Sequence, residues 1–257
     1  MRVPVVQHTT RRQRARRRRA LWTGGELLVT AGLVLLLLVV HQLWWTNREA
    51  RRGAERKVEA LEREWGDGAT DKGGDSGTPV PAATPQPRTG TRDSRQVATA
   101  AQPRPSWSQA YAILVIPRLG LRVPVAEGVS KQEVLNKGYV GHYRGTGQPG
   151  QVGNFALAGH RNTHGEPFRY INRLRAKDLV EVETKTATYT YAVDRTLPQT
   201  SAGDSGVVRP IPRSTVEPGY GYSEPGYYIT LTTCTPEYTS RYRLVVWGKL
   251  VSMRPRA

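Results

Sequence analysis

The chain has 257 residues, with 38 Lys and Arg against 21 Asp and Glu, which gives a formal net charge of +17. This length and a hydrophobic content of 38% predict one globular domain with disordered flanks. A single Cys excludes both a disulfide framework and a cysteine-rich zinc site.

About half of the net positive charge, +8 of +17, lies in one N-terminal segment. The first 20 residues contain eight Arg and no acidic residue, whereas residues 106–257 contain 19 basic and 11 acidic residues. Only the excess of basic residues in 106–257 can belong to the surface of a folded domain. We therefore expect no nucleic-acid partner, because a nucleic-acid-binding domain concentrates its charge on that surface.

The Arg-rich segment is followed by 19 residues without a formal charge, Leu27–Trp45. At ~1.5 Å per residue a helix of this length reaches about 28 Å, close to the ~30 Å thickness of a bilayer core. A buried core helix is the alternative. The neighbouring arginines and the terminal Trp44 and Trp45 favour a membrane span with an aromatic belt.

The charge asymmetry also predicts an orientation. Residues 1–26 form a cytoplasmic tail, residues 27–45 a signal anchor, and everything after the anchor lies outside the cell. A cleavable signal peptide is the rival, but the apolar segment exceeds its usual length and no small-residue cleavage site follows. The expected location is the cell membrane, in a single pass.

Residues 46–105 are expected to be a juxtamembrane stalk followed by a disordered linker. Residues 47–65 have a helix-forming composition with mixed charges, and of the two alternatives, a short helix or a solvated stalk, we favour the stalk. From residue 66 to about 105, Gly, Pro, Thr, Ala and Ser dominate. Such a composition buries too little surface to fold, which predicts a tether.

From residue 106 onward, short β-branched and aromatic segments alternate with Gly and Pro, which predicts seven or eight strands. An antiparallel barrel or sandwich of about 150 residues follows, since only 131–138 and 167–175 look helical. A long connection, 196–226, is expected to form one wall of a binding groove. The expected strands begin at Tyr111, Leu121, Asn154, Asp178, Thr186, Tyr227 and Arg243.

Cys234 is the one thiol of this outer domain, at the end of a strand that Pro236 terminates. The alternatives are a small buried hydrophobic residue and a nucleophile at the rim of the sheet, which would need a base and a positive neighbour. His160 also follows a strand, and Arg243 begins the strand after Cys234. These three residues predict a thiol acyl-transfer site in which Arg243 stabilises an oxyanion.

Three other residues are weaker candidates. His142 is expected in a turn between glycines, and His164 in a loop. His160 and His164 have a metal-pair spacing, but further ligands are lacking, so we predict no metal. Arg241 competes with Arg243 for the oxyanion role, and the fixed position of Arg243 within the strand favours Arg243.

The segments TLTTC, RLVV nine residues later and NFALAGHR upstream together resemble the sortase family, in the class E type of actinobacteria. The resemblance covers roughly residues 108–252. It implies a mainly β fold, an eight-stranded sortase-type barrel with short helices, preceded by one N-terminal transmembrane helix. It also implies a catalytic triad of His160, Cys234 and Arg243, with no cofactor.

The reaction implied by the resemblance is transpeptidation. Secreted proteins with a C-terminal LAxTG- or LPxTG-like sorting signal would be cleaved between Thr and Gly through a Cys234 thioester. The acyl group would then pass to the amine of a peptidoglycan precursor. Class E resemblance further suggests two substrate-binding residues: Tyr143, associated with a preference for Ala in the signal, and Thr233, whose hydroxyl lies next to the Cys.

Two other functions stay open on the sequence alone. The outer domain could be a non-enzymatic, membrane-tethered β-domain that binds anionic wall polymer through its basic surface, and such binding would weaken with salt. It could also be a hydrolytic thiol peptidase that uses water in place of an amine. Product analysis with and without an amine separates the peptidase from the transpeptidase.

Overall fold

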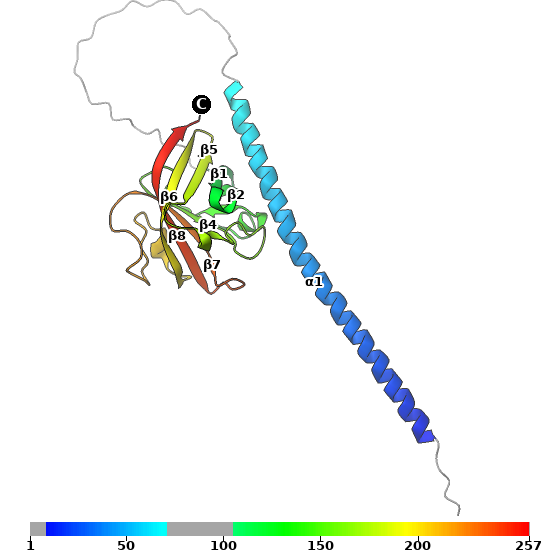
Figure 1. Ribbon diagram of the computed structural model, residues 1–257. Helices are drawn as coiled ribbons and strands as arrows, with labels where there is room; N and C mark the ends of the chain where they lie inside the picture. Colours follow the sequence, from blue (N-terminus) through cyan, green and yellow to red (C-terminus); the bar gives the residue numbers. More distant parts are fainter. Residues whose placement is uncertain (1–8, 71–104, 257) are drawn as a thin grey trace, which may run out of the picture.

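The structure, a computed structural model, describes residues 9–70 and 105–256, which form one long helix and one barrel (Figure 1). The helix, α1, is Thr9–Thr70. Single-turn 3-10 helices η1 (Pro117–Leu119), η2 (Leu135–Lys137), η3 (Ile171–Arg173) and η4 (Ser205–Val208) lie in the connections. The strands are β1 (Ala110–Ile116), β2 (Leu121–Glu127), β3 (Val140–His142), β4 (Gly153–Ala158), β5 (Leu179–Thr184), β6 (Ala187–Ser201), β7 (Tyr227–Thr235) and β8 (Tyr242–Pro255).

The eight strands close into a barrel in the order β1-β2-β3-β4-β7-β8-β6-β5. This confirms the expected mainly β, eight-stranded barrel. The sequence predicted an antiparallel barrel, and this detail is wrong. Two strand pairs, β2 with β3 and β4 with β7, are parallel. Parallel neighbours need a crossover between them, and the chain between β4 and β7 supplies one by forming β5 and β6 on the way.

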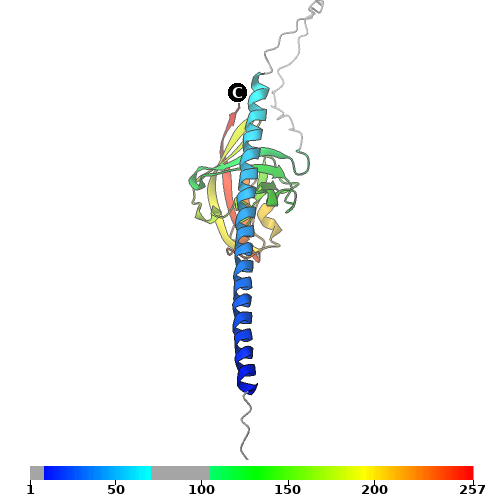
Figure 2. The ribbon, with the colours of Figure 1, turned by 90° about the vertical axis from the view of Figure 1, so that its right-hand side faces the viewer.

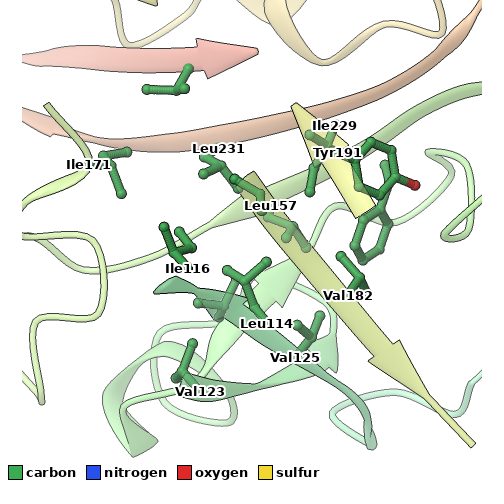
Figure 3. Packing of buried hydrophobic residues seen from close by; sticks show 14 of the residues in the cluster. Leu114, Ile116, Val123, Val125, Leu157, Ile171, Val182, Tyr191, Ile229 and Leu231 are labelled. Carbon is green, nitrogen blue, oxygen red and sulfur yellow. The ribbon is translucent and has the colours of Figure 1, made fainter. Parts of the chain in front are cut away.

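The interior of the barrel is filled by one residue in two from each strand, because side chains alternate between the faces of a sheet. Figure 3 shows these residues converging from several strands. Phe155 and Leu157 of β4, Ile229 and Leu231 of β7, and Leu244 and Val246 of β8 belong to this cluster. Their neighbours in sequence therefore lie on the outer face of the same three strands.

Strand β3 was missed in the sequence because it is only three residues long. The turn expected around His142 is wrong: the residue is completely buried in β3. Its Nδ1 atom lies 2.7 Å from the buried carboxylate of Glu127, and its Nε2 atom 2.9 Å from the Thr146 hydroxyl. These bonds fix the turn that follows β3.

The N-terminal half of α1 stands clear of the barrel in Figures 1 and 2. Its side chains between Leu27 and Val40 are all exposed, and they form the apolar run that the sequence assigns to a bilayer. Among the described residues, α1 is the one helix long and apolar enough to cross a membrane.

The second half of α1 packs along the barrel, so the expectation of a solvated stalk over 47–65 is wrong. The small and apolar residues of one helical face are buried, and Leu61 retains only 2% of its exposure. They contact Ile113 of β1 and Ala126 of β2, and Figure 1 shows these two strands on the side of the barrel next to the helix. The buried residues are Ala50, Ala54, Val58, Leu61 and Trp65.

The packing has a simple cause in the sequence. These five positions recur at intervals of three or four residues, which places them on one stripe of a helix. The mixed charges hid that stripe, since the remaining positions are mostly Arg, Lys and Glu. The tether expected after residue 66 falls largely on 71–104, outside the described residues.

Strand β6 continues to Ser201, further than the sequence indicated, and it pairs with β8 across irregular positions at Asp194 and Pro198. The long connection before β7 is therefore shorter than expected, at 202–226. It is ordered by buried Asp204, whose carboxylate accepts hydrogen bonds from the hydroxyls of Thr200, Ser214 and Thr215.

Candidate active site

The candidate residues come from the ends of three adjacent strands, β4, β7 and β8. Cys234 of β7 lies directly opposite Arg243 of β8 in the antiparallel register. On the other side of β7, Ala158 pairs with Thr232 in parallel, and the amide of Gly159 donates to the Thr232 carbonyl at 3.2 Å. Ala158 and Thr232 form the last pair of β4 and β7. His160 and Cys234 each follow this pair by two residues along the sequence.

Strand alternation places two of the three side chains on one face. Leu231 and Thr233 alternate with Thr232 and Cys234, and since Leu231 points into the core, Cys234 points outward. The same alternation turns Arg243 outward next to buried Leu244, and Arg243 is the register partner of Cys234. His160 follows the end of the neighbouring strand β4 by two residues. We call these three positions, His160, Cys234 and Arg243, the row.

Arg243 is held in place by the backbone at the start of β8. Its Nη1 atom donates to the carbonyls of Ser240 and Tyr242, both at 2.9 Å, and the side chain is half-buried. Arg241 lies before the strand, exposed, with its guanidinium over the ring of Tyr242. Of the two arginines, Arg243 alone is paired with Cys234 in the sheet register.

His160 receives a defined orientation from Asn136, the middle residue of η2. The Nε2 atom of His160 lies 2.9 Å from Asn136 Oδ1, which can only accept a hydrogen bond. The neutral imidazole therefore carries its proton on Nε2, and Nδ1 is the free basic nitrogen. Sequence patterns did not single out Asn136, which lies 24 residues before His160 in the chain.

The surroundings of His160 disfavour its charged form. Burial of the ring, with smaller contributions from the neighbouring His164 and the positive charge of Lys131, lowers the pKa of His160 to about 4. The imidazole is therefore neutral near pH 7. The ring of His164 stacks on it at a centroid distance of 5.3 Å.

Arg161 is a residue of the site that the sequence analysis overlooked, although it directly follows His160. Its buried guanidinium donates to the Cys234 carbonyl at 3.2 Å and to the Thr235 hydroxyl at 2.9 Å. An ion pair with Glu237, at 3.6 Å, holds its other end. Arg161 thus fixes the backbone that carries the thiol, and the sequence offered only its adjacency to His160.

Tyr143 is brought to the same outer face, two residues from the thiol along β7. Its hydroxyl lies 3.1 Å from that of Thr232, which itself donates to the Leu157 carbonyl at 3.0 Å. Because Thr232 has a single hydroxyl proton, Tyr143 is the donor in this pair. The free lone pairs of Tyr143 remain able to accept a hydrogen bond.

The structure does not bring Thr233 into this row. Thr233 faces away from the Cys234 side of β7, and its buried hydroxyl donates to the Gly159 carbonyl at 2.8 Å. The strand alternation that places Cys234 outward requires this. On the outward side of β7, the hydroxyl nearest to Cys234 in sequence is that of Thr232.

The connection 202–226 covers the outer face beside the row. Its Val207 carbonyl accepts hydrogen bonds from Trp247 at 3.2 Å and from Thr230 at 3.3 Å. Val207 and Tyr222 of this connection pack with Trp247 of β8. The connection thus forms a raised border along the strands that carry Cys234 and Arg243.

The arrangement combines a half-buried thiol, a neutral imidazole with a free nitrogen and a fixed guanidinium. A thiol nucleophile, a proton acceptor and a cationic donor are the parts needed for acyl transfer through a thioester. Within residues 9–70 and 105–256 there is no group of three or more His, Cys, Asp or Glu able to hold a metal ion.

Comparison with known proteins agrees with this chemistry. The family model described as the Sortase domain matches residues 114–251. Sortase SrtE1 of Streptomyces coelicolor is 41% identical over 84% of this chain, which spans 53% of that protein, about half its length. Sortase SrtE2 of the same organism is 36% identical over 81% of this chain and 73% of that protein.

Solved structures give the same result for the barrel. The crystal structure of Sortase E1 from Streptomyces coelicolor, with a tripeptide in its active site, superposes with a TM-score of 0.55 at 49% identity. The alignment covers 60% of this chain and 94% of that one. Sortase E from Streptomyces avermitilis gives 0.51 at 40% identity, over 58% and 93% of the two chains. The chain therefore belongs to the sortase family of transpeptidases.

Proposed function

We propose that this chain is a membrane-anchored cysteine transpeptidase that cleaves a C-terminal sorting signal of secreted proteins between Thr and Gly. The row of His160, Cys234 and Arg243 at the ends of three adjacent strands carries the proposal. The tripeptide in the active site of the Streptomyces coelicolor enzyme supports a peptide substrate for this site as well.

The first half of the reaction forms a thioester. The Cys234 thiol passes its proton to Nδ1 of His160, and the resulting thiolate attacks the carbonyl carbon of the signal Thr. Arg243 stabilises the oxyanion that develops on the carbonyl oxygen. The imidazolium then protonates the nitrogen of the leaving Gly, the C–N bond breaks, and the acyl group stays on the sulfur.

The second half transfers the acyl group to an amine of a peptidoglycan precursor. The amine attacks the thioester carbonyl while His160 takes its proton, and the C–S bond breaks as the new amide forms. The proton returns from His160 to the sulfur, which restores the neutral thiol and imidazole. Water in place of the amine would give hydrolysis, so the acceptor decides between the two outcomes.

The anchor follows from α1. We infer that Leu27–Trp45 spans the membrane with the Arg-rich residues 1–26 in the cytoplasm, because cytoplasmic flanks carry the positive excess. The barrel then lies on the outer side, where secreted substrates and wall precursors are found.

The test uses the full chain in detergent or nanodiscs with matched LAxTG and LPxTG peptides, with and without an amine acceptor. Mass spectrometry is expected to show peptide joined to the amine with loss of the segment that begins at Gly. Hydrolysed peptide alone, with no ligation at any amine concentration, would support the thiol peptidase. Binding of anionic polymer without any cleavage would support the non-enzymatic alternative.

A further inference from the structure

The loop after His160 has an unusual backbone. His164, Gly165 and Glu166 have φ angles of +52°, +85° and +53°, so three consecutive residues lie in the left-handed region. Two of them carry a Cβ, which makes this conformation unfavourable without outside support. The imidazole of His164 stacks on that of His160, so the shape of the loop bears directly on the candidate base.

The support comes from the first turn of α1 after the apolar segment. Asn47 donates from Nδ2 to Glu166 Oε1 at 2.6 Å, and its Oδ1 accepts from the Gly165 amide at 2.6 Å. Arg51 donates from Nε to the Gly165 carbonyl at 3.1 Å and from Nη2 to Glu166 Oε2 at 3.2 Å. The carboxylate of Glu166 is nearly buried in these contacts, with 6% of its side chain exposed.

The same turn of α1 also contacts the other support of His160. Gly138 caps η2, the 3-10 helix that contains Asn136, the hydrogen-bond partner of His160. A Cβ at Gly138 would lie 2.7 Å from the Ala50 carbonyl oxygen, so the two backbones are in close contact. The stretch Asn47–Arg51 therefore touches both segments that fix the imidazole.

Packing alone does not hold the loop against the helix. A cavity of about 250 Å³ lies between them, lined among others by Arg51, Ala54, Gly165, Glu166 and Tyr170. The polar contacts of Asn47 and Arg51 are the hydrogen bonds that α1 makes to the loop, and Arg169, on the barrel side, also donates to Glu166 Oε2 at 2.7 Å.

We propose that Asn47 and Arg51 are positioning residues, through which the membrane-proximal turn of α1 holds the 160–166 loop and so orients His160 for proton transfer. The inference rests on the proposed function of His160. Since α1 is continuous from the apolar segment, Asn47 lies two residues, or about 3 Å of helix rise, beyond Trp45. Correct geometry at His160 thus depends on the anchor helix, a dependence that a barrel cut away from α1 would lose.

The test compares Asn47→Ala, Arg51→Ala and the double variant with the wild-type full chain in nanodiscs. Arg52→Ala is the matched control, because Arg52 is an exposed arginine of the same turn. We expect kcat for ligation to fall about 10- to 100-fold in the double variant, as for a misplaced catalytic group, with KM for the peptide almost unchanged. Arg52→Ala should behave as the wild type.

Two further measurements separate positioning from a loss of folding. Amide hydrogen exchange should rise at residues 162–167 in the variants and stay unchanged in β7 and β8. The acid limb of the pH profile of kcat should move toward higher pH, because a loosened loop exposes His160 and relieves the burial that lowers its pKa. The charged and titratable neighbours that act on this ring, Lys131 and His164, keep their identity in the variants, and Arg51 is paired with Glu166.

Unchanged kcat, pH profile and exchange in the double variant would overturn the proposal. If the double variant does not fold, Arg51→Lys keeps a charge near Glu166 but loses the Nε bond to Gly165, and a smaller shift in the same readouts is expected. His160→Ala distinguishes failure of the positioning role from failure of the proposed function. An active His160→Ala enzyme would contradict the proposed function itself. If His160→Ala is inactive while the Asn47 and Arg51 variants are fully active, only the positioning role is contradicted.

Discussion

The inner and outer faces of β4, β7 and β8 are made by alternate residues of the same three strands, yet they serve different purposes. The inner face is apolar and closed, with Leu157, Leu231 and Val246 in the core. The outer face carries Cys234 and Arg243 at the strand ends, with Tyr143 and Thr232 joined by a hydrogen bond beside them, and His160 follows the end of β4. Neighbours in sequence are therefore divided between stability and chemistry.

This division explains why the site can be precise without being deeply buried. The core residues pack against the inner side of each strand, and this packing fixes the position and direction of the outward side chains. The outer residues contribute little to the core and remain free to react. Substitutions on the outer face should alter turnover with small changes in stability, and substitutions on the inner face should do the reverse.

The strongest test of the outer face is Cys234→Ala. We expect cleavage and ligation to fall by about 10⁴-fold or more, as on removal of other covalent nucleophiles. The change in the free energy of unfolding should stay below about 1 kcal/mol, because the thiol is half-buried at a rim and fills little core volume. Ligation assays and thermal unfolding on one preparation give both numbers, and turnover within about 10-fold of the wild type would refute the thioester mechanism.

The corresponding test of the inner face is Leu231→Ala, three residues earlier on β7. Leu231 is 1% exposed, and truncation of such a residue costs about 2–5 kcal/mol through lost burial and the cavity left behind. Denaturant unfolding measures the loss. At a temperature where the variant is folded, kcat should remain within a few-fold of the wild type, and a loss comparable to that of Cys234→Ala would show that the two faces are not separable.

Much of this division could be predicted from the sequence. Period-two alternation and the Gly and Pro boundaries located seven of the eight strands, and the apolar run identified the candidate membrane span. The placement of Cys234 at a strand end follows from Pro236, which cannot continue a strand. These signals are local, and local patterns are what a sequence displays directly.

Features that depend on distant partners could not be predicted in this way. The stripe of small and apolar residues on α1 is present in the sequence. Its burial, for example at Ala54 and Leu61, depends on the barrel packing against it. Asn136 acquires its role from a neighbour 24 residues away, and β3 is a strand because β2 and β4 flank it. Thr233 was chosen because it is adjacent to the Cys, whereas alternation along β7 turns its side chain to the inner face of the strand.

The next prediction separates two arginines of the β7–β8 hairpin. Arg243→Ala should lower kcat by about 10²- to 10³-fold, because a preorganised donor to the oxyanion is lost. Arg241→Ala is the matched control and should lose much less, since Arg241 is exposed before the strand. Steady-state kinetics on both variants decides between them, and a larger loss in Arg241→Ala would mean that the wrong arginine has been assigned to the oxyanion.

The smallest expected effect concerns substrate choice, through Tyr143→Phe. The variant removes one hydroxyl, while Thr232 keeps its bond to the Leu157 carbonyl, so the strands should stay as they are. A neutral hydrogen bond contributes about 0.5–1.5 kcal/mol, which corresponds to a few-fold change in kcat/KM. We expect the ratio of kcat/KM for LAxTG over LPxTG peptides to fall by that factor, because the Tyr143 hydroxyl is the polar group that the turn after β3 places on the outer face. Tyr227→Phe, at the opposite end of β7, is the control and should leave the ratio unchanged. An unaltered ratio in Tyr143→Phe would mean that the tyrosine serves only to tie the β3–β4 turn to β7.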